Sequence, residues 1–118
     1  MSNILVIDDD VVILKLISDF LENKGFTVKQ ALNKKIAINE LVENKVNAII
    51  VNLKAPETFG VDVILFCKNN FPKIPVFILT QANAFQSYED TLGVGNIAHV
   101  FKLPPDMHEI EKALREIK

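Results

Sequence analysis

The chain has 118 residues, which fits one domain, and its 49% hydrophobic content supplies enough apolar surface for a single packed core. The net charge is -2 and the basic residues are scattered rather than clustered, so a direct nucleic-acid partner is not expected. A single cysteine excludes an internal disulfide, and no segment near the N-terminus resembles a signal or membrane anchor, so we expect one cytoplasmic domain over residues 1–118 without a membrane partner.

Five short segments are predicted to be strands. Four of them are unbroken apolar runs, at residues 4–7, 48–51, 76–79 and, more weakly, 97–101. Runs rich in Val and Ile without polar alternation are typical of strands buried on both faces, which favours a parallel sheet covered by helices. A more polar fifth strand at residues 26–28 is expected at an edge of the sheet.

Helices are predicted between these strands. Asp10 can cap the first helix and Gly25 can end it, and the second, third and fifth helices are expected after Asn33, Gly60 and Asp106. The apolar faces are assigned to Ile13, Leu16, Ile17, Phe20 and Leu21; to Ile38, Leu41 and Val42; to Val61, Ile64 and Leu65; and to Met107, Ile110, Leu114 and Ile117. In the first helix Lys15, Ser18, Asp19 and Glu22 are expected to face water, and in the third Cys67 is expected to be a small buried hydrophobe.

A fourth helix is predicted over residues 84–92, where Phe85, Tyr88 and Leu92 form the apolar repeat. Strand and helix thus alternate five times. Right-handed crossovers between parallel strands then favour a doubly wound three-layer α/β fold with strand order 2-1-3-4-5 and five helices. In that order strands one and three flank the switch point, and ligands bind beyond the carboxyl ends of the strands there.

Polar side chains gather at that edge of the predicted sheet. Asp8, Asp9 and Asp10 follow strand one, and Asn52 follows strand three. Thr80 and Lys102 end strands four and five. Closely spaced acids are usually retained beside a cation, and oxygen ligands suit Mg²⁺, while a lysine and a hydroxyl can hold a phosphoryl group.

Four segments of the chain resemble those of the receiver domain of two-component response regulators, which has a flavodoxin-like fold. The resemblance covers essentially the whole chain. Val6-Ile7-Asp8-Asp9-Asp10 is similar to the acidic pair, Ile50-Val51-Asn52-Leu53-Lys54-Ala55-Pro56 to the phosphoacceptor segment, Ile78-Leu79-Thr80 to the hydroxyl segment, and Phe101-Lys102 to the lysine segment. Intervals of 43, 28 and 22 residues separate Asp9, Asn52, Thr80 and Lys102, similar to the spacing of the family.

The resemblance implies roles for these positions. Asp9 would bind Mg²⁺ directly, Asp8 through water and Lys54 through its backbone carbonyl, while Lys102 and Thr80 would contact the phosphoryl group. The family nucleophile is an aspartate, and here Asn52 stands in its place. A carboxamide is neutral and a poor nucleophile, so phosphorylation at Asn52 is not expected.

Losing one anionic ligand also predicts weak or absent Mg²⁺ binding at Asp8, Asp9, Asn52 and Lys54, and no cofactor is expected. Relief of charge repulsion among the acids is worth roughly 1 kcal/mol to the fold. Lys102 is expected to pair with Asp8 or Asp9 instead of with phosphate.

Two further positions depart from the pattern of the family. His99 stands three residues before the lysine, where receivers usually place an aromatic switch residue, and is interpreted as a partly exposed strand histidine. Leu103 follows Lys102 where receivers usually place a proline preceded by a cis peptide bond. A cis Lys-Leu bond would cost about 3 kcal/mol, so this bond is expected to be trans.

The sequence therefore predicts a pseudo-receiver, not an enzyme, that acts in a two-component phosphorelay through protein-protein interaction without phosphorylation. Partners such as a histidine kinase or an output domain are expected to dock on the fourth helix, fifth strand and fifth helix. Two alternatives stay open: a receiver that accepts phosphate on Asp8, Asp9 or Asp10, and a conventional receiver carrying an introduced Asp-to-Asn change at position 52. A nucleotide or flavin domain is disfavoured because no glycine-rich loop follows the first strand.

Overall fold

The computed structural model describes residues 2–53, 59–80 and 97–117. Five parallel strands form one sheet in the order β2-β1-β3-β4-β5, which confirms the predicted topology. The strands are β1 (Asn3–Ile7), β2 (Thr27–Ala31), β3 (Ala48–Leu53), β4 (Val76–Thr80) and β5 (Ile97–Lys102).

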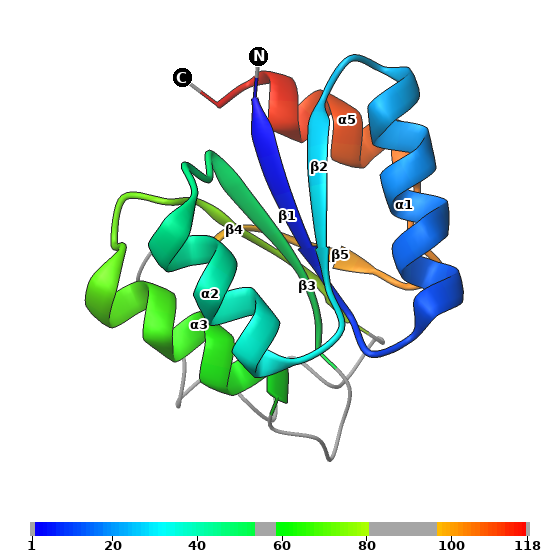
Figure 1. The fold of residues 1–118 in the computed structure, drawn as a ribbon. Coiled ribbons are helices and arrows are strands. Elements are labelled where there is room, and N and C mark those ends of the chain that lie inside the picture. The colour runs from blue at the N-terminus through cyan, green and yellow to red at the C-terminus, as the bar shows by residue number, and fades with distance from the viewer. Residues whose placement is uncertain (1, 54–58, 81–96, 118) are drawn as a thin grey trace.

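Helices cover both faces of the sheet. Figure 1 shows α1 (Val11–Asn23) with α5 (Met107–Arg115) on one face, and α2 (Lys34–Glu43) with α3 (Phe59–Asn70) on the other. Two separate clusters of buried apolar side chains, one on each face, fit these three layers. The helix predicted over residues 84–92, with Phe85 and Tyr88, lies outside the described residues.

Local sequence signals explain where the helices begin and end. Asp10 accepts hydrogen bonds from the first-turn amides of α1, and Asn33 and Asp106 do the same for α2 and α5. Gly25 follows α1 with a φ of 96°, the left-handed conformation that favours glycine. These caps agree with the predicted helix boundaries.

The predicted apolar face of α1 is partly wrong. Leu16 is 55% exposed, whereas Ser18, expected to face water, is 1% exposed. The helix buries Leu14, Ile17, Ser18 and Leu21, a stripe with spacings of three and four residues that includes one hydroxyl. The Ser18 hydroxyl has no hydrogen-bond partner in the described part of the chain.

The faces of α2 and α3 also show where periodicity succeeds and fails. In α2 Leu41 is buried as expected, but Val42 is 64% exposed, and Ala37 takes the inner position. In α3 Val61 and Ile64 are buried, and Cys67 is fully buried as predicted.

Two strands differ from the predicted pattern. Asn52 does not follow β3 but lies within it, since the strand continues to Leu53 and is buried throughout. In β5 Ala98, His99 and Val100 are exposed, because β5 is an edge strand rather than a fully covered one. None of the described helices is long and apolar enough to cross a membrane.

Candidate functional site

The site is built where the carboxyl ends of β1 and β3 meet. Ile7 of β1 lies beside Val51 of β3, so the next residues, Asp8 and Asn52, are brought together at the edge of the sheet. Asn52 Nδ2 donates a hydrogen bond of 2.7 Å to Asp8 Oδ2. Both side chains are buried, with Asp8 2% and Asn52 6% exposed.

Asp8 also connects the site to the start of α1. Its Oδ1 accepts a hydrogen bond of 2.9 Å from the backbone amide of Asp10. Asp10 Oδ1 in turn accepts the amides of Val12 at 2.9 Å and Ile13 at 3.4 Å. A continuous hydrogen-bonded path therefore runs from β3 through Asp8 to the first turn of α1.

The orientation of the Asn52 amide follows from chemistry. Turning it over would place Oδ1 against the Asp8 carboxylate, where two acceptors repel each other. In the observed orientation Asn52 Oδ1 is buried without a hydrogen-bond partner among the described residues. A charge-assisted hydrogen bond is about twice as strong as a neutral one, which explains why this orientation is favoured.

The other predicted residues that the structure describes lie along the same edge of the sheet. Thr80 of β4 is buried, and in the sheet register it lies opposite Leu53 of β3 and Lys102 of β5. Asp9 and Lys102 are exposed. Lys54, the predicted backbone ligand, lies outside the described residues.

The expected ion pair between Lys102 and Asp8 or Asp9 is wrong. Within the described ranges Lys102 forms no ion pair with either acid. Lys102 is on β5, which two intervening strands separate from β1, and Asp8 accepts the Asn52 amide instead.

The segment after Lys102 has the expected trans Lys102–Leu103 bond. The cis bond in this segment is Leu103–Pro104, one residue later. The Leu103 amide donates to the Thr80 carbonyl at 2.9 Å, so it remains attached to β4. His99 is exposed as predicted, and its ring stacks on Phe101 with the ring centres 4.6 Å apart.

Only part of the predicted donor set for a divalent cation lies within the described residues, which include Asp8, Asp9 and Asn52 but not Lys54. Among the described residues no three His, Cys, Asp or Glu side chains are grouped so as to hold a metal. Asp8 already accepts two hydrogen bonds, and Asn52 presents its NH₂ group, not its oxygen, to that carboxylate. The observed arrangement therefore does not fit Mg²⁺ at Asp8 and Asn52 unless the amide turns.

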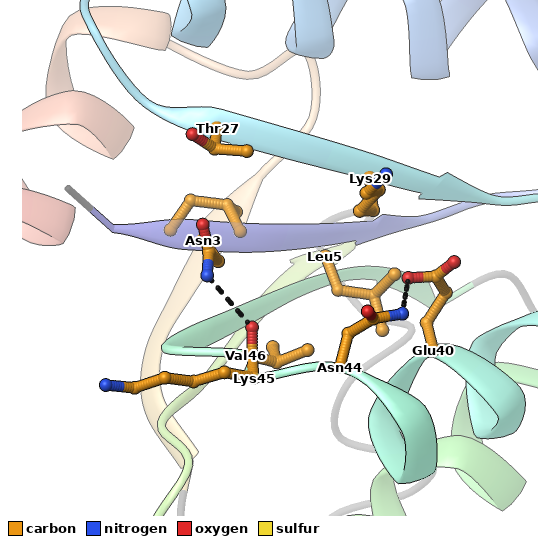
Figure 2. Close-up of a pocket in the computed structure, with 9 residues that line it drawn as sticks. Asn3, Leu5, Thr27, Lys29, Glu40, Asn44, Lys45 and Val46 are labelled. Carbon is orange, nitrogen blue, oxygen red and sulfur yellow. Dashed lines mark hydrogen bonds between the residues drawn. The ribbon is translucent and has the colours of Figure 1, made fainter.

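Two hollows lie away from this site. One, of about 120 Å³, opens at the amino ends of β1 and β2 and is lined by side chains that include Asn3, Leu5, Lys29 and Glu40. Figure 2 shows its polar residues bonded to one another, with Asn44 donating to Glu40 and Asn3 to the Lys45 carbonyl. It is at the opposite end of the strands from Asn52.

The second hollow, of about 280 Å³, lies between β5 and α5. Its lining residues are His99, Phe101, Glu109, Lys112, Ala113 and Glu116. The mixture of two aromatic rings with charges of both signs distinguishes this face from the acidic edge at Asp8.

The alternation of strands and helices was enough to predict which residues reach the edge, but not how they bond. The Asn52 to Asp8 contact has a sequence signal, since an amide donor follows one apolar run and a carboxylate follows the run of the neighbouring strand. Neither the burial of Ser18 nor the contact between Phe20 and His108, whose ring centres are 5.5 Å apart, has a comparable signal.

Comparison with known proteins agrees with the architecture. A model of the response regulator receiver domain matches residues 4–115. Sporulation initiation phosphotransferase F of Bacillus subtilis is 24% identical over 115 residues, which cover 98% of this chain and 92% of that protein. Transcriptional regulatory protein CrdR of Helicobacter pylori is 25% identical over 115 residues, but the chain spans only 54% of its length.

A solved structure shows the same fold. The response regulator TrrA of Thermotoga maritima, in complex with Mg(2+)-BeF, superposes with a TM-score of 0.85 at 18% identity, and the match covers 100% of both chains. With the sheet order, the polar edge and the match over residues 4–115, the chain belongs to the response regulator receiver domain family.

Proposed function

We propose that this receiver domain signals by binding partner proteins without being phosphorylated. The observation that carries the proposal is the Asn52 side chain, buried at the place of the expected nucleophile and hydrogen-bonded to Asp8 at 2.7 Å. Because a carboxamide carries no negative charge, it does not attack phosphorus as a carboxylate does.

The rest of the pocket is compatible with loss of phosphotransfer. Thr80 and Lys102, which would hold a phosphoryl group, lie in register on neighbouring strands. In this proposal they retain positions inherited from an active receiver. Any Mg²⁺ binding at Asp8, Asp9, Asn52 and the Lys54 carbonyl is weak, because the cation would have to compete with the Asn52 amide for Asp8.

The proposed docking surface comprises the fourth helix expected over residues 84–92, β5 and α5. Exposed His99 and Val100 and the hollow of about 280 Å³ beside Ala113 support the part formed by β5 and α5. Its mixed charges, with Lys112 beside Glu109 and Glu116, suit a protein partner such as a histidine kinase or an output domain.

Incubation with acetyl phosphate and Mg²⁺, followed by intact-mass measurement, tests the absence of phosphotransfer. We expect no added phosphoryl mass on the wild-type chain, because position 52 lacks a carboxylate. The matched control is Asn52→Asp, which restores the carboxylate and is expected to gain one base-labile phosphoryl group.

Peptide mapping makes the outcome decisive. A stoichiometric phosphoryl group on wild-type Asp8, Asp9 or Asp10 would overturn the proposal in favour of an alternative acceptor. Asp8 is poorly suited to that role, since it is buried and already accepts hydrogen bonds from Asn52 and Asp10.

A further inference from the structure

We propose that the carboxamide of Asn52, by donating a hydrogen bond, stabilises the buried carboxylate of Asp8 in place of a divalent cation. A buried carboxylate is costly unless it is paired and hydrogen-bonded. Asp8 is 2% exposed and receives the Asn52 Nδ2 hydrogen at 2.7 Å. This stabilising donor is part of the chain and is not supplied from solution.

The contact between Asn52 and Asp8 also holds the start of α1 in place. Asp8 Oδ1 accepts the Asp10 amide, and Asp10 caps the amides of Val12 and Ile13. Asn52 therefore acts on the start of α1 through Asp8 and is a positioning residue for that turn. The turn carries Val11 and Val12, which are 60% and 71% exposed, so the same contact sets where these apolar side chains are presented.

The Asn52 amide and a cation exclude each other at Asp8. Asn52 presents a hydrogen-bond donor to Asp8 Oδ2, on the side where a cation, or a water bound to it, would lie between the two residues. Turning the amide to offer Oδ1 to the cation would break this bond. The cation would gain only one neutral oxygen ligand, while the protein would lose the hydrogen bond between Asn52 and Asp8. Mg²⁺ therefore has little affinity for the folded wild-type chain.

This inference shares with the proposed function the premise that Asn52 is not phosphorylated, but it does not depend on any docking partner. The inference is tested by the effect of Mg²⁺ on unfolding, whereas the proposed function is tested by the mass of an added phosphoryl group. Either can fail without the other.

The test is urea unfolding of the whole chain in EDTA and in Mg²⁺, for the wild type and for Asn52→Asp. A ligand shifts the unfolding constant by the factor one plus its concentration over its Kd, so weak binding predicts a change below about twofold for the wild type. Asn52→Asp removes the donor and adds a like charge, so its unfolding constant in EDTA is expected to rise about tenfold and to return towards the wild-type value in Mg²⁺.

A swapped variant provides the matched control. Asp8→Asn combined with Asn52→Asp keeps one amide and one carboxylate but exchanges their positions. It is expected to regain most of the stability in EDTA and to respond less to Mg²⁺ than Asn52→Asp. If Asn52→Asp does not fold in either buffer, the swapped variant decides: folding in EDTA supports the inference, and failure to fold overturns it.

Amide hydrogen exchange separates this positioning role from a general loss of stability. In EDTA the amides of Asp10, Val12 and Ile13 are expected to exchange faster in Asn52→Asp than in the wild type, and this increase is expected to exceed that of the amides in β4. In Mg²⁺ the same three amides are expected to regain protection. Two results overturn the inference: equal Mg²⁺ stabilisation of the wild type and Asn52→Asp, or unchanged stability and exchange of Asn52→Asp in EDTA.

Discussion

At the scale of single residues, one nitrogen atom changes the chemistry of the acidic edge. An aspartate at position 52 would place a second carboxylate against Asp8, whereas the asparagine places a donor 2.7 Å from Asp8 Oδ2. In the proposed function this residue stands in place of the nucleophile, and in the further inference it stabilises a buried carboxylate without a metal ion. Its Oδ1, buried without a partner among the described residues, is the unfavourable part of this arrangement.

Cys67 gives a prediction about the dependence of stability on pH. Burial raises the pKa of its thiol from 9.0 to about 12, because the thiolate would lose its hydration. The folded chain then keeps the proton that the unfolded chain releases above pH 9, so this contribution to stability is complete below pH 9 and is lost as pH rises towards 12.

The measurement is the free energy of unfolding as a function of pH for the wild type and Cys67→Ala. Between pH 9 and 12 the wild type is expected to lose up to about 1.4 kcal/mol per pH unit more than the variant, the value for one proton. Parallel curves over that interval would show that the thiol titrates normally in the folded chain. Differences below pH 9 reflect packing and do not bear on the prediction.

At the scale of elements, the contact between α3 and β3 is tight at Gly60. A Cβ atom there would lie 2.8 Å from Leu53 Cδ2 and 3.2 Å from the backbone oxygen of Asn52. The Leu53 methyl group can move aside, but the strand carbonyl cannot move without disturbing the sheet. The close approach of α3 therefore depends on the missing side chain.

Gly60→Ala is accordingly expected to destabilise the chain, by roughly 1–3 kcal/mol in urea unfolding, because α3 must shift away from β3. Without such crowding, replacing glycine by alanine in a helix stabilises by about 1 kcal/mol, so the sign of the change is diagnostic. Asn69→Ala, at an exposed position of α3, is the control for helix propensity and is expected to be neutral or stabilising. A more stable Gly60→Ala variant would mean that the helix is not held by this approach.

The elements also show what periodicity in a sequence can predict. Apolar runs located β1, β3, β4 and β5, and capping residues located the starts of α1, α2 and α5, because both signals are local. The third helix was expected after Gly60, but α3 begins at Phe59. The face of α1 was partly wrong because Leu16 and Leu14 define two overlapping stripes, and only packing against the sheet selects the one that includes Leu14 and Ser18. Propensity alone does not reveal that a hydroxyl occupies a core position.

At the scale of the whole molecule, the strand order followed from five strand-helix units and the handedness of their crossovers. That order brought Asp8, Asn52, Thr80 and Lys102 to one edge, as predicted. The hydrogen bonds and ion pairs among these residues could not be predicted from the strand order. Lys102, for example, was expected to form an ion pair with Asp8 or Asp9 and does not. Bond partners depend on side-chain placement across three neighbouring strand pairs, which the order of elements does not specify.

In the proposed function, this receiver no longer responds to the ligands that switch active members of its family. The most direct measurement is the amide NMR spectrum of the chain before and after addition of Mg²⁺ and beryllofluoride, a mimic of the phosphoryl group on an aspartate. We expect the wild-type signals of Thr80, His99 and Lys102 to stay in place and those of Asn52→Asp to shift. Shifts of the same signals in the wild type, at the same ligand concentrations, would contradict the proposed function.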